Sequence, residues 1–326
     1  MNPIAVQYNS FMENYSKTKA CAKLKLIPSV IDYLWCSVKY GSSASDYFEL
    51  EFYDKSGKSR STFLTYRLKM KFFHRVNDYS KKALFDDKTK FFETFPEYIH
   101  REWLKLADAS FDRFNAFVQK HSSFIAKPIA ASGGKGVRLV STSAMKEDKL
   151  RELYEALTAE GAIIEEIIEQ HHMMAKLYPY SANTMRIATA VVKGEMRILG
   201  AALRCGSGGG SIDNYSAGGL AAKIDPETGI VISDATNSKH ERLYKHPDTG
   251  VFFHGFQIPH WEKVLKMLED VTHRVPGVGY TGWDVVIRED GPALIEGNFE
   301  GMIHVLQQPA NQGIKAAVEQ ILKELK

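Results

Sequence analysis

The segment 282–298 constrains the fold of this chain most, because it reads as two β-strands joined by a tight turn. Its Asp290-Gly291 pair suits a three-residue loop, in which the glycine takes the left-handed conformation. Strands that leave such a loop pair Asp284 with Glu296, whose Cβ atoms then lie ~5 Å apart on one face. The segment therefore predicts an antiparallel hairpin that carries two facing carboxylates.

A third oxygen ligand joins that face, because Asn298 follows Glu296 by two residues. Two carboxylates at this distance repel unless a cation or a proton lies between them, and hard oxygen ligands suit Mg²⁺. We therefore expect Asp284, Glu296 and Asn298 to bind Mg²⁺. The alternative is a solvated hairpin, because a one-residue slip caused by Pro292 would separate the acids. The apolar residues expected on the opposite, core-facing side are Val285, Ile287 and Ile295.

A glycine-rich segment follows the expected strand 124–129. Consecutive glycines let backbone N–H groups approach a polyphosphate, and lysines add positive charge. The segment is not a Walker A loop, because Gly136 and not Ser or Thr follows its lysine. An ordinary turn between strands is the alternative. The candidate phosphate-binding residues are Lys127, Ser132, Gly133, Gly134, Lys135 and Gly136.

The rest of the chain reads as mixed α+β. The first ~120 residues are aromatic, basic and mainly helical, with one extended piece at 47–53. Helices are expected around 150–157, 264–271 and 314–325, and a hairpin turn at 193–195. From Ser123 onward, short β-branched runs predict largely antiparallel strands at 124–129, 137–140, 162–168, 184–192, 196–205, 283–287 and 293–296.

Composition excludes several classes of protein. Of the 326 residues, 44% are hydrophobic and 25% are charged, which excludes a disordered or collagen-like chain. The net charge of +3 gives no argument for nucleic-acid binding. Three scattered cysteines are too few for a zinc cage or a disulfide framework. We expect a cytoplasmic protein that does not bind nucleic acid.

The apolar run 26–38 is the segment closest to a membrane signal, but it contains Asp32 and is shorter than a spanning helix. The N-terminus lacks the apolar core of a signal peptide, so no integral membrane association is expected. A buried helix with a solvated basic edge is the favoured interpretation, and a helix against an acidic membrane surface is the alternative. The basic residues that precede the run are Lys17, Lys19, Lys23 and Lys25.

The order of these motifs resembles the ATP-grasp superfamily, and within it the sugar-transfer-associated group linked to polysaccharide assembly. The resemblance spans about 86–312. It implies an α+β ATP-grasp fold, in which two lobes with mainly antiparallel sheets grip ATP, after a mostly helical N-terminal region. The implied parts are 1–85 for that region, 86–170 for the small lobe and 171–326 for the large lobe. Further matching positions are 183–186, Arg204, Asp213, Asn214, Gly218 and Gly219.

The resemblance also implies roles for individual residues. Asp284, Glu296 and Asn298 would bind the Mg²⁺ that bridges the phosphates. Arg186 and Arg204 would face the γ-phosphate as catalytic residues. The residues implied in ATP binding are Lys88, Lys127, Ser132, Gly133, Gly134, Lys135, Gly136, Glu165 (at the adenine amine), Glu166, Ile168 and Asn214.

Two features depart from the pattern of D-alanine–D-alanine ligase-type members, and a third departs from that of many ATP-grasp ligases. Gly282 stands where those ligases have an arginine, and His172 stands where they have a glutamate for the ribose. The ribose contact would then fall to His171 or His172. The N-terminal region shows no parallel-sheet lobe.

The activity implied is that of an ATP- and Mg²⁺-dependent carboxylate–amine ligase that forms an acyl phosphate. Its partners would be a small-molecule carboxylate, such as a sugar acid or an amino acid, and an amine. A small-molecule kinase or an inactive nucleotide-binding scaffold are the alternatives. A protein kinase is disfavoured, because 100–102 (His-Arg-Glu) lacks the catalytic aspartate and no Asp-Phe-Gly triplet occurs. The sequence does not indicate the oligomeric state.

Overall fold

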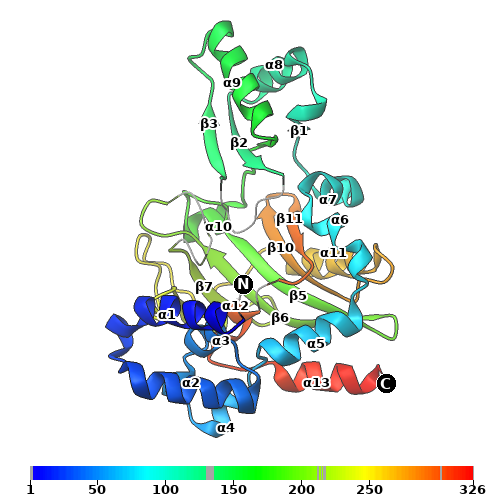
Figure 1. Ribbon diagram of the computed structural model, residues 1–326. Coiled ribbons are helices and arrows are strands. Elements are labelled where there is room, and N and C mark those ends of the chain that lie inside the picture. Colours follow the sequence, from blue (N-terminus) through cyan, green and yellow to red (C-terminus); the bar gives the residue numbers. More distant parts are fainter. Residues whose placement is uncertain are drawn as a thin grey trace.

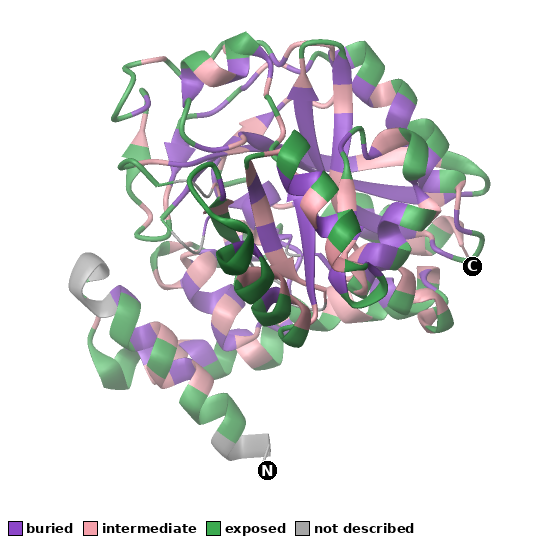
Figure 2. Cartoon of the chain, turned by 90° about the horizontal axis from the view of Figure 1, so that it is seen from above, coloured by how far each residue is buried: buried purple, intermediate pink, exposed green. Residues whose placement is uncertain are grey.

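The computed structural model describes residues 3–129, 136–210, 213, 215, 218–301 and 303–325, and the side chains of these except 3–5 and 19–22. Two antiparallel sheets and a helical N-terminal region make up the chain (Figure 1). Figure 2 shows that buried residues concentrate in the strands, while the outer helix faces are exposed. In the part of the chain that is described, no helix is both long and apolar enough to cross a bilayer.

The N-terminal region consists of helices and short 3₁₀ turns, as the sequence predicts (Figure 1, blue to cyan). Buried aromatic rings, among them Phe11, Tyr33 and Phe52, form its core. Its helices are α1 (Pro3–Ala22), α2 (Leu26–Tyr40), α3 (Ala44–Glu49), α4 (Gly57–Arg60), α5 (Tyr66–Val76), α6 (Ala83–Asp86) and α7 (Lys88–Thr94), with 3₁₀ turns at Phe52–Asp54, Tyr79–Lys81 and Pro96–Tyr98.

Two expectations about this region are wrong. Residues 47–53 are not extended, because a capping box between Ser43 and Asp46 starts helix α3 and the following rings pack as parts of helical turns. Helix α2 is not buried, since its apolar face lies on the outside and only Ser29, Tyr33 and Cys36 are buried.

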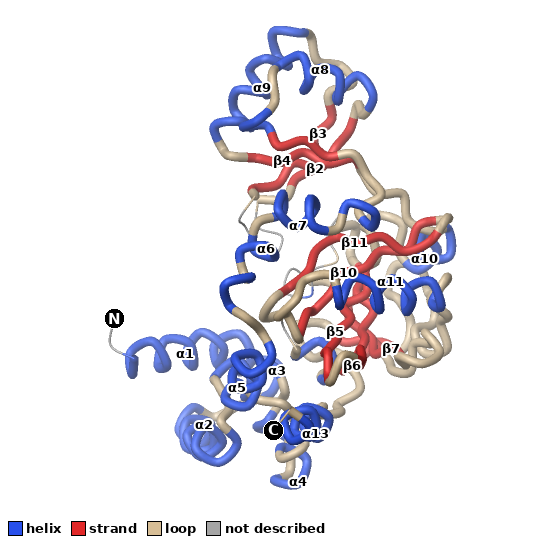
Figure 3. The backbone as a smooth tube through the Cα atoms, turned by 90° about the vertical axis from the view of Figure 1, so that its right-hand side faces the viewer, coloured by secondary structure: helices blue, strands red, loops and turns tan. Residues whose placement is uncertain are grey.

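The smaller sheet has four strands in the order β1-β4-β2-β3, and Figure 3 shows it above the larger sheet. Helices α8 (Phe111–Lys120) and α9 (Glu147–Ala159) cover its outer face, where Phe124, Ala126 and Ile164 alternate into the core. The opposite face carries Lys127 and Glu165. The strands are β1 (Trp103–Lys105), β2 (Ser123–Pro128), β3 (Arg138–Ser141) and β4 (Ala162–Glu166), with a 3₁₀ turn at Leu106–Asp108.

The larger sheet has seven strands in the order β11-β10-β5-β6-β7-β8-β9, all antiparallel. Helix α11 (Trp261–His273) packs on one face, and α5 with α13 (Lys315–Glu324) lies against the other. The strands are β5 (Thr184–Val192), β6 (Glu195–Cys205), β7 (Leu220–Ile224), β8 (Ala235–Thr236), β9 (Arg242–Leu243), β10 (Tyr280–Arg288) and β11 (Gly291–Asn298). The remaining helices are α10 (His172–Leu177) and α12 (His304–Gln307).

The strands and helices expected after Ser123 are confirmed, with small differences in their bounds. The strand expected at 162–168 ends at Glu166, and β1, β7, β8 and β9 were not predicted. Between β5 and β6 the turn is Lys193-Gly194, whose φ values of 54° and 87° are those of a two-residue hairpin turn. The predicted mixed α+β fold with antiparallel sheets is therefore confirmed.

Candidate functional site

The hairpin of β10 and β11 pairs Asp284 with Glu296, as expected, but by a different route. Its turn has two residues and not three, since Arg288 pairs with Gly291, and this shifts the register by one. A β-bulge next to Asp284 adds one residue to β11 and restores the register. The bulge, and not the turn, therefore brings the two acids opposite each other.

The extra residue is Ile295, because Val285 pairs with Leu294 and Asp284 pairs with Glu296, which leaves Ile295 without a partner on β10. Leu294 is fully buried in the core beside Val285 and Ile287, whereas Ile295 is only half-buried. The expectation that Ile295 faces the core is wrong for this reason.

Asp284 is bound by two arginines from neighbouring strands. Arg186 of β5 pairs directly with it across the sheet and donates from Nε to Oδ1 and from Nη2 to Oδ2, the latter at 3.0 Å. Arg204 of β6 donates from Nη2 to the same Oδ2 at 2.9 Å. Burial alone would raise the pKa of Asp284, but the two guanidinium groups outweigh it and lower the pKa to about 2.

Glu296 lies next to Asp284 in a different electrostatic setting. Burial and the charge of Asp284 raise its pKa above the ordinary value, and a side-chain hydrogen bond links the two acids. The Nδ2 of Asn298 donates to Glu296 Oε1 and to the carbonyl oxygen of Gly282, both at 3.3 Å. The three predicted metal ligands therefore converge on one spot of the sheet.

The smaller sheet brings a lysine and a glutamate to the same region. Lys127 Nζ lies 2.5 Å from Glu165 Oε1, and both side chains are almost fully buried. Burial and the neighbouring Arg101 hold the pKa of Lys127 well below its usual range, while the charge of Glu296 acts in the opposite direction. Lys88 donates from Nζ to the carbonyl of Ile129 at 3.2 Å, and burial lowers its pKa against the charge of Glu296.

Arg101 is a site residue that sequence reasoning missed. Its Nε donates to Glu165 Oε2 at 2.6 Å, and its Nη1 donates to the carbonyl of Leu294 at 2.8 Å. Its Nη2 also lies 3.4 Å from the carbonyl of Ile295, the bulge residue. One buried guanidinium thus ties the smaller sheet to the bulge that sets the register of the acids. No motif marks this arginine, because two of its acceptors are backbone carbonyls that only the folded hairpin presents.

Asp213 orients Arg204 through Thr184. The N–H of Thr184 donates to Asp213 Oδ2 at 3.1 Å, and its hydroxyl donates to the same oxygen. That hydroxyl oxygen accepts from Arg204 Nη2 at 2.7 Å. Burial raises the pKa of Asp213, against the charge of Arg204. The arginine is therefore held from two sides, by Asp284 and by Thr184.

The other predicted nucleotide-binding residues lie at the edge of this region or outside the described residues. Glu166 continues the pairing with β1, since its N–H donates to the carbonyl of Glu102 at 2.9 Å. Ile168 is half-buried just after β4. Gly136 has a φ of 74°, and a Cβ there would lie 2.8 Å from Pro128 Cγ. The predicted residues outside the described part are Ser132, Gly133, Gly134, Lys135 and Asn214.

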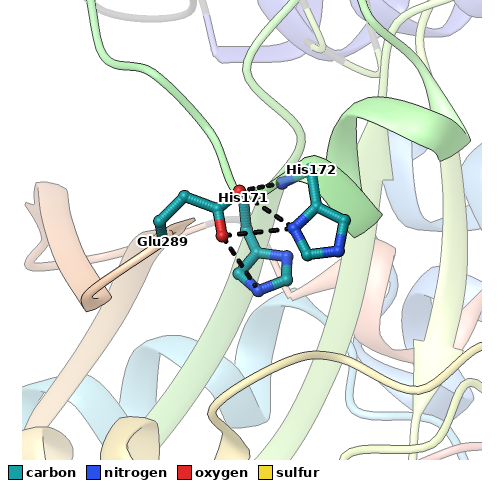
Figure 4. Close-up of side chains that lie close together, drawn as sticks. All are labelled: His171, His172 and Glu289. Atoms are coloured by element: carbon teal, nitrogen blue, oxygen red, sulfur yellow. Dashed lines mark hydrogen bonds and ion pairs between the residues drawn. The ribbon is translucent and has the colours of Figure 1, made fainter.

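His171 and His172, the candidates for a ribose contact, both face Glu289 in the hairpin turn (Figure 4). Glu289 Oε1 accepts from the N–H of His172 at 2.6 Å and lies 3.0 Å from its Nδ1. Nδ1 of His171 accepts from the N–H of Met173, so the proton of its neutral ring lies on Nε2, 3.5 Å from Glu289 Oε2. Hydrogen bonds thus attach the start of α10 to the tip of the hairpin.

Residues 67–323 match the profile of the family described as sugar-transfer associated ATP-grasp. The chain belongs to this family. The two antiparallel sheets are accordingly those of an ATP-grasp fold, as the sequence predicted. No curated protein matches the chain.

Several solved structures are similar to this ATP-grasp chain. The ATP-grasp ligase PsnB complexed with a minimal precursor is 14% identical over 76% of this chain and 64% of its own, with a TM-score of 0.47. The D-alanine–D-alanine ligase of Bacillus anthracis complexed with ATP is 12% identical over 76% and 68%, with a TM-score of 0.46. N5-carboxyaminoimidazole synthetase of Staphylococcus aureus complexed with ADP is 9% identical over 73% and 54%, with a TM-score of 0.44. The chain thus spans less than two thirds of the length of PsnB.

Proposed function

We propose that this ATP-grasp protein is an ATP- and Mg²⁺-dependent ligase that joins a small-molecule carboxylate to an amine through an acyl phosphate. The observation that carries the proposal is the meeting of opposite charges between the sheets. Asp284 and Glu296 form an acidic pair, and Arg186, Arg204 and Lys127 surround it. Transfer of a γ-phosphoryl group requires carboxylates that bind a metal cation, next to arginine and lysine side chains that bind phosphate oxygens.

The donor set fits Mg²⁺. Burial and the charge of Asp284 raise the pKa of Glu296, and a divalent cation between the two carboxylates would relieve the same repulsion. Asn298 would supply a neutral amide oxygen, because its amide can be placed the other way round, with Oδ1 in the position of Nδ2. Bound there, Mg²⁺ would neutralise phosphate charge and leave coordination positions for water and phosphate oxygens.

The arginines and lysines of the chain would align the triphosphate. Arg204 binds Asp284 on one side and Thr184 on the other, so its guanidinium is fixed before substrate arrives. We propose that it faces the γ-phosphate, that Arg186 keeps Asp284 ionised, and that Lys127 turns from Glu165 to a phosphate oxygen. Glu165 would then accept from the adenine amine, with the Glu166 and Ile168 backbones at the edge of the base and Lys88 on the phosphates. The glycine-rich residues and Asn214 would complete the nucleotide site.

In the proposed reaction, a carboxylate oxygen of the substrate attacks the γ-phosphorus in line. The bond from that phosphorus to the β,γ-bridging oxygen breaks, which gives an acyl phosphate and ADP. An amine nitrogen then attacks the acyl carbon, the carbon–oxygen bond to phosphate breaks, and the nitrogen loses a proton. No side-chain nucleophile takes part, so positioning and charge neutralisation supply the catalysis.

Hydroxylamine trapping tests the proposal. The protein is incubated with ATP, MgCl₂ and hydroxylamine, together with sugar acids and amino acids one at a time. We expect ADP and a hydroxamate to form in equal amounts with at least one acid, because hydroxylamine captures an acyl phosphate.

Glu296→Gln removes one metal-binding carboxylate and keeps its shape, so it should lower the rate by at least about a hundredfold with the fold intact. Normal activity of this variant would exclude the metal assignment. A stable phosphorylated alcohol would identify a kinase, and nucleotide binding without turnover of any acid would favour a scaffold.

A further inference from the structure

Helix α2 presents a continuous apolar face to the outside. Its residues follow the i, i+4, i+7, i+8, i+11 spacing of one helix side, which we call the outer stripe. Figure 1 places the helix at the lower edge of the molecule, away from both sheets. The outer stripe consists of Ile27 (72% exposed), Ile31 (64%), Leu34 (56%), Trp35 (45%) and Val38 (77%). Single exposed apolar residues are common, but a contiguous set of this kind marks a contact surface.

The inner side of α2 is fixed, so the outer stripe does not turn inward by a small rotation. Tyr33 and Cys36 are buried in the core of the N-terminal region. Asp32, the only acid between residues 23 and 40, pairs with Arg60 through both carboxylate oxygens at 2.7 and 2.8 Å. The single negative charge of the helix is therefore turned toward the protein and already neutralised.

Both ends of the outer stripe are basic. Lys23 and Lys25 are exposed just before the helix, and Lys39 is exposed at its end with Nζ 4.4 Å above the ring of Trp35. The exposed Arg67 adds a charge at that end, where it donates to the carbonyl of Ser37 at 2.9 Å. The surface thus combines apolar side chains and an indole ring with cations at both ends, and Asp32, the acid of this helix, is paired with Arg60.

We propose that the outer stripe of α2 docks the protein on an anionic lipid surface. The 15-residue helix is about 22 Å long and would lie in the plane of the interface, with the apolar side chains among the acyl chains and the lysines at the lipid phosphates. A second copy of the chain fits less well. In either orientation of two packed α2 helices, Lys25 would face Lys25 or Lys39 of the other copy, and like charges repel.

Vesicle binding by the full chain tests this proposal. Vesicles of phosphatidylcholine alone, or with phosphatidylglycerol as about a third of the lipid to give a negative surface potential, are sedimented with the protein at low salt. We expect binding to the anionic vesicles only, weakened as salt rises. Ile31→Glu should lower the affinity by at least about tenfold, because an apolar side chain is lost and a like charge is added at the surface. Lys25→Glu should lower it by more than about fivefold.

Leu139→Glu is the matched control, because Leu139 is 59% exposed on β3, which lies at the opposite end of the molecule from α2 (Figure 1), and it should leave binding unchanged. Trp35 offers a second readout, because Trp261 and Trp283 are only 5% and 1% exposed and the half-buried Trp103 lies on β1 of the smaller sheet. Its fluorescence should shift to shorter wavelength with anionic vesicles, and Trp35→Phe should abolish the shift. Circular dichroism verifies that each variant is folded.

The proposal is overturned if the protein binds neither vesicle type, binds both equally, or binds anionic vesicles unchanged after Ile31→Glu. It is also overturned if vesicle binding is absent while gel filtration shows a dimer that Ile31→Glu dissociates, since the outer stripe would then join two copies. These outcomes are separable from the proposed ligase activity, because none of the measurements involves ATP or Mg²⁺.

Discussion

Replacement of Arg101 by leucine should destabilise this protein more than any surface change. The Arg101 and Glu165 side chains are 1% and 4% exposed, so the variant leaves a buried carboxylate with one counter-charge in place of two. Loss of one partner from a buried ion pair costs ~3–5 kcal/mol. Lys127 still lies beside the Glu165 carboxylate in this variant, so we expect the lower end of that range, ~3 kcal/mol. The bulge carbonyls that lose their donor add ~1 kcal/mol each if no water replaces it. Together these terms predict a loss of about 5 kcal/mol of unfolding free energy.

Urea denaturation followed by circular dichroism measures this loss. Arg274→Leu is the matched control, because Arg274 forms ion pairs with Glu97 and Asp270 at the surface and should lose no more than ~1 kcal/mol. The double variant Arg101→Leu/Glu165→Leu should recover part of the stability, since it removes the stranded charge. If Arg101→Leu lowers the free energy of unfolding no more than Arg274→Leu does, the interpretation that Arg101 connects the smaller sheet to the bulge is refuted.

Three further predictions concern local packing and thiol chemistry. Gly297→Ala should reduce the free energy of unfolding by ~1–3 kcal/mol and weaken Mg²⁺-dependent nucleotide binding, because the new Cβ would lie 2.7 Å from the ring of Phe91. An unchanged melting temperature together with unchanged nucleotide binding would contradict this prediction. Gly136→Ala should lower the melting temperature, since its φ is 74° and its Cβ would lie 2.8 Å from Pro128 Cγ. Burial raises the pKa of Cys36 to about 11 despite the nearby arginine, so its alkylation at pH 8, followed by mass spectrometry, should be slow until the protein unfolds; rapid labelling of the native protein would refute this.

The sequence predicts which residues form the site better than it predicts how the backbone brings them together. Alternating apolar residues and a tight turn were enough to predict that Asp284 faces Glu296. The bulge at Ile295 could not be predicted, because a two-residue turn with a bulge and a three-residue turn without one give the same pairing of the acids. Arg101 shares this difficulty, since two of its acceptors are carbonyls that the bulge exposes.

The errors in the N-terminal region have different physical causes. Aromatic residues at 47–53 favour a strand locally, but the capping box of Ser43 and Asp46 and the aromatic core decide for helix. For α2, periodicity predicts an apolar side but not which side of the helix the protein covers. That choice depends on Asp32 and Arg60, which lie 28 residues apart in the chain and meet only in the folded state.

The bulge at Ile295 divides the β10–β11 hairpin into two stretches with separate registers. The outer stretch ends in Glu289, which is attached to α10 through His172, and the inner stretch carries Asp284 and Glu296. An insertion or deletion of one residue at the tip would change the register of the outer stretch, and a change at the bulge would compensate for it, so that the pairing of the acids is kept. Arg101 already donates to the carbonyls of Leu294 and Ile295 at the bulge. The hairpin can therefore tolerate variation at its far end while its carboxylates stay aligned.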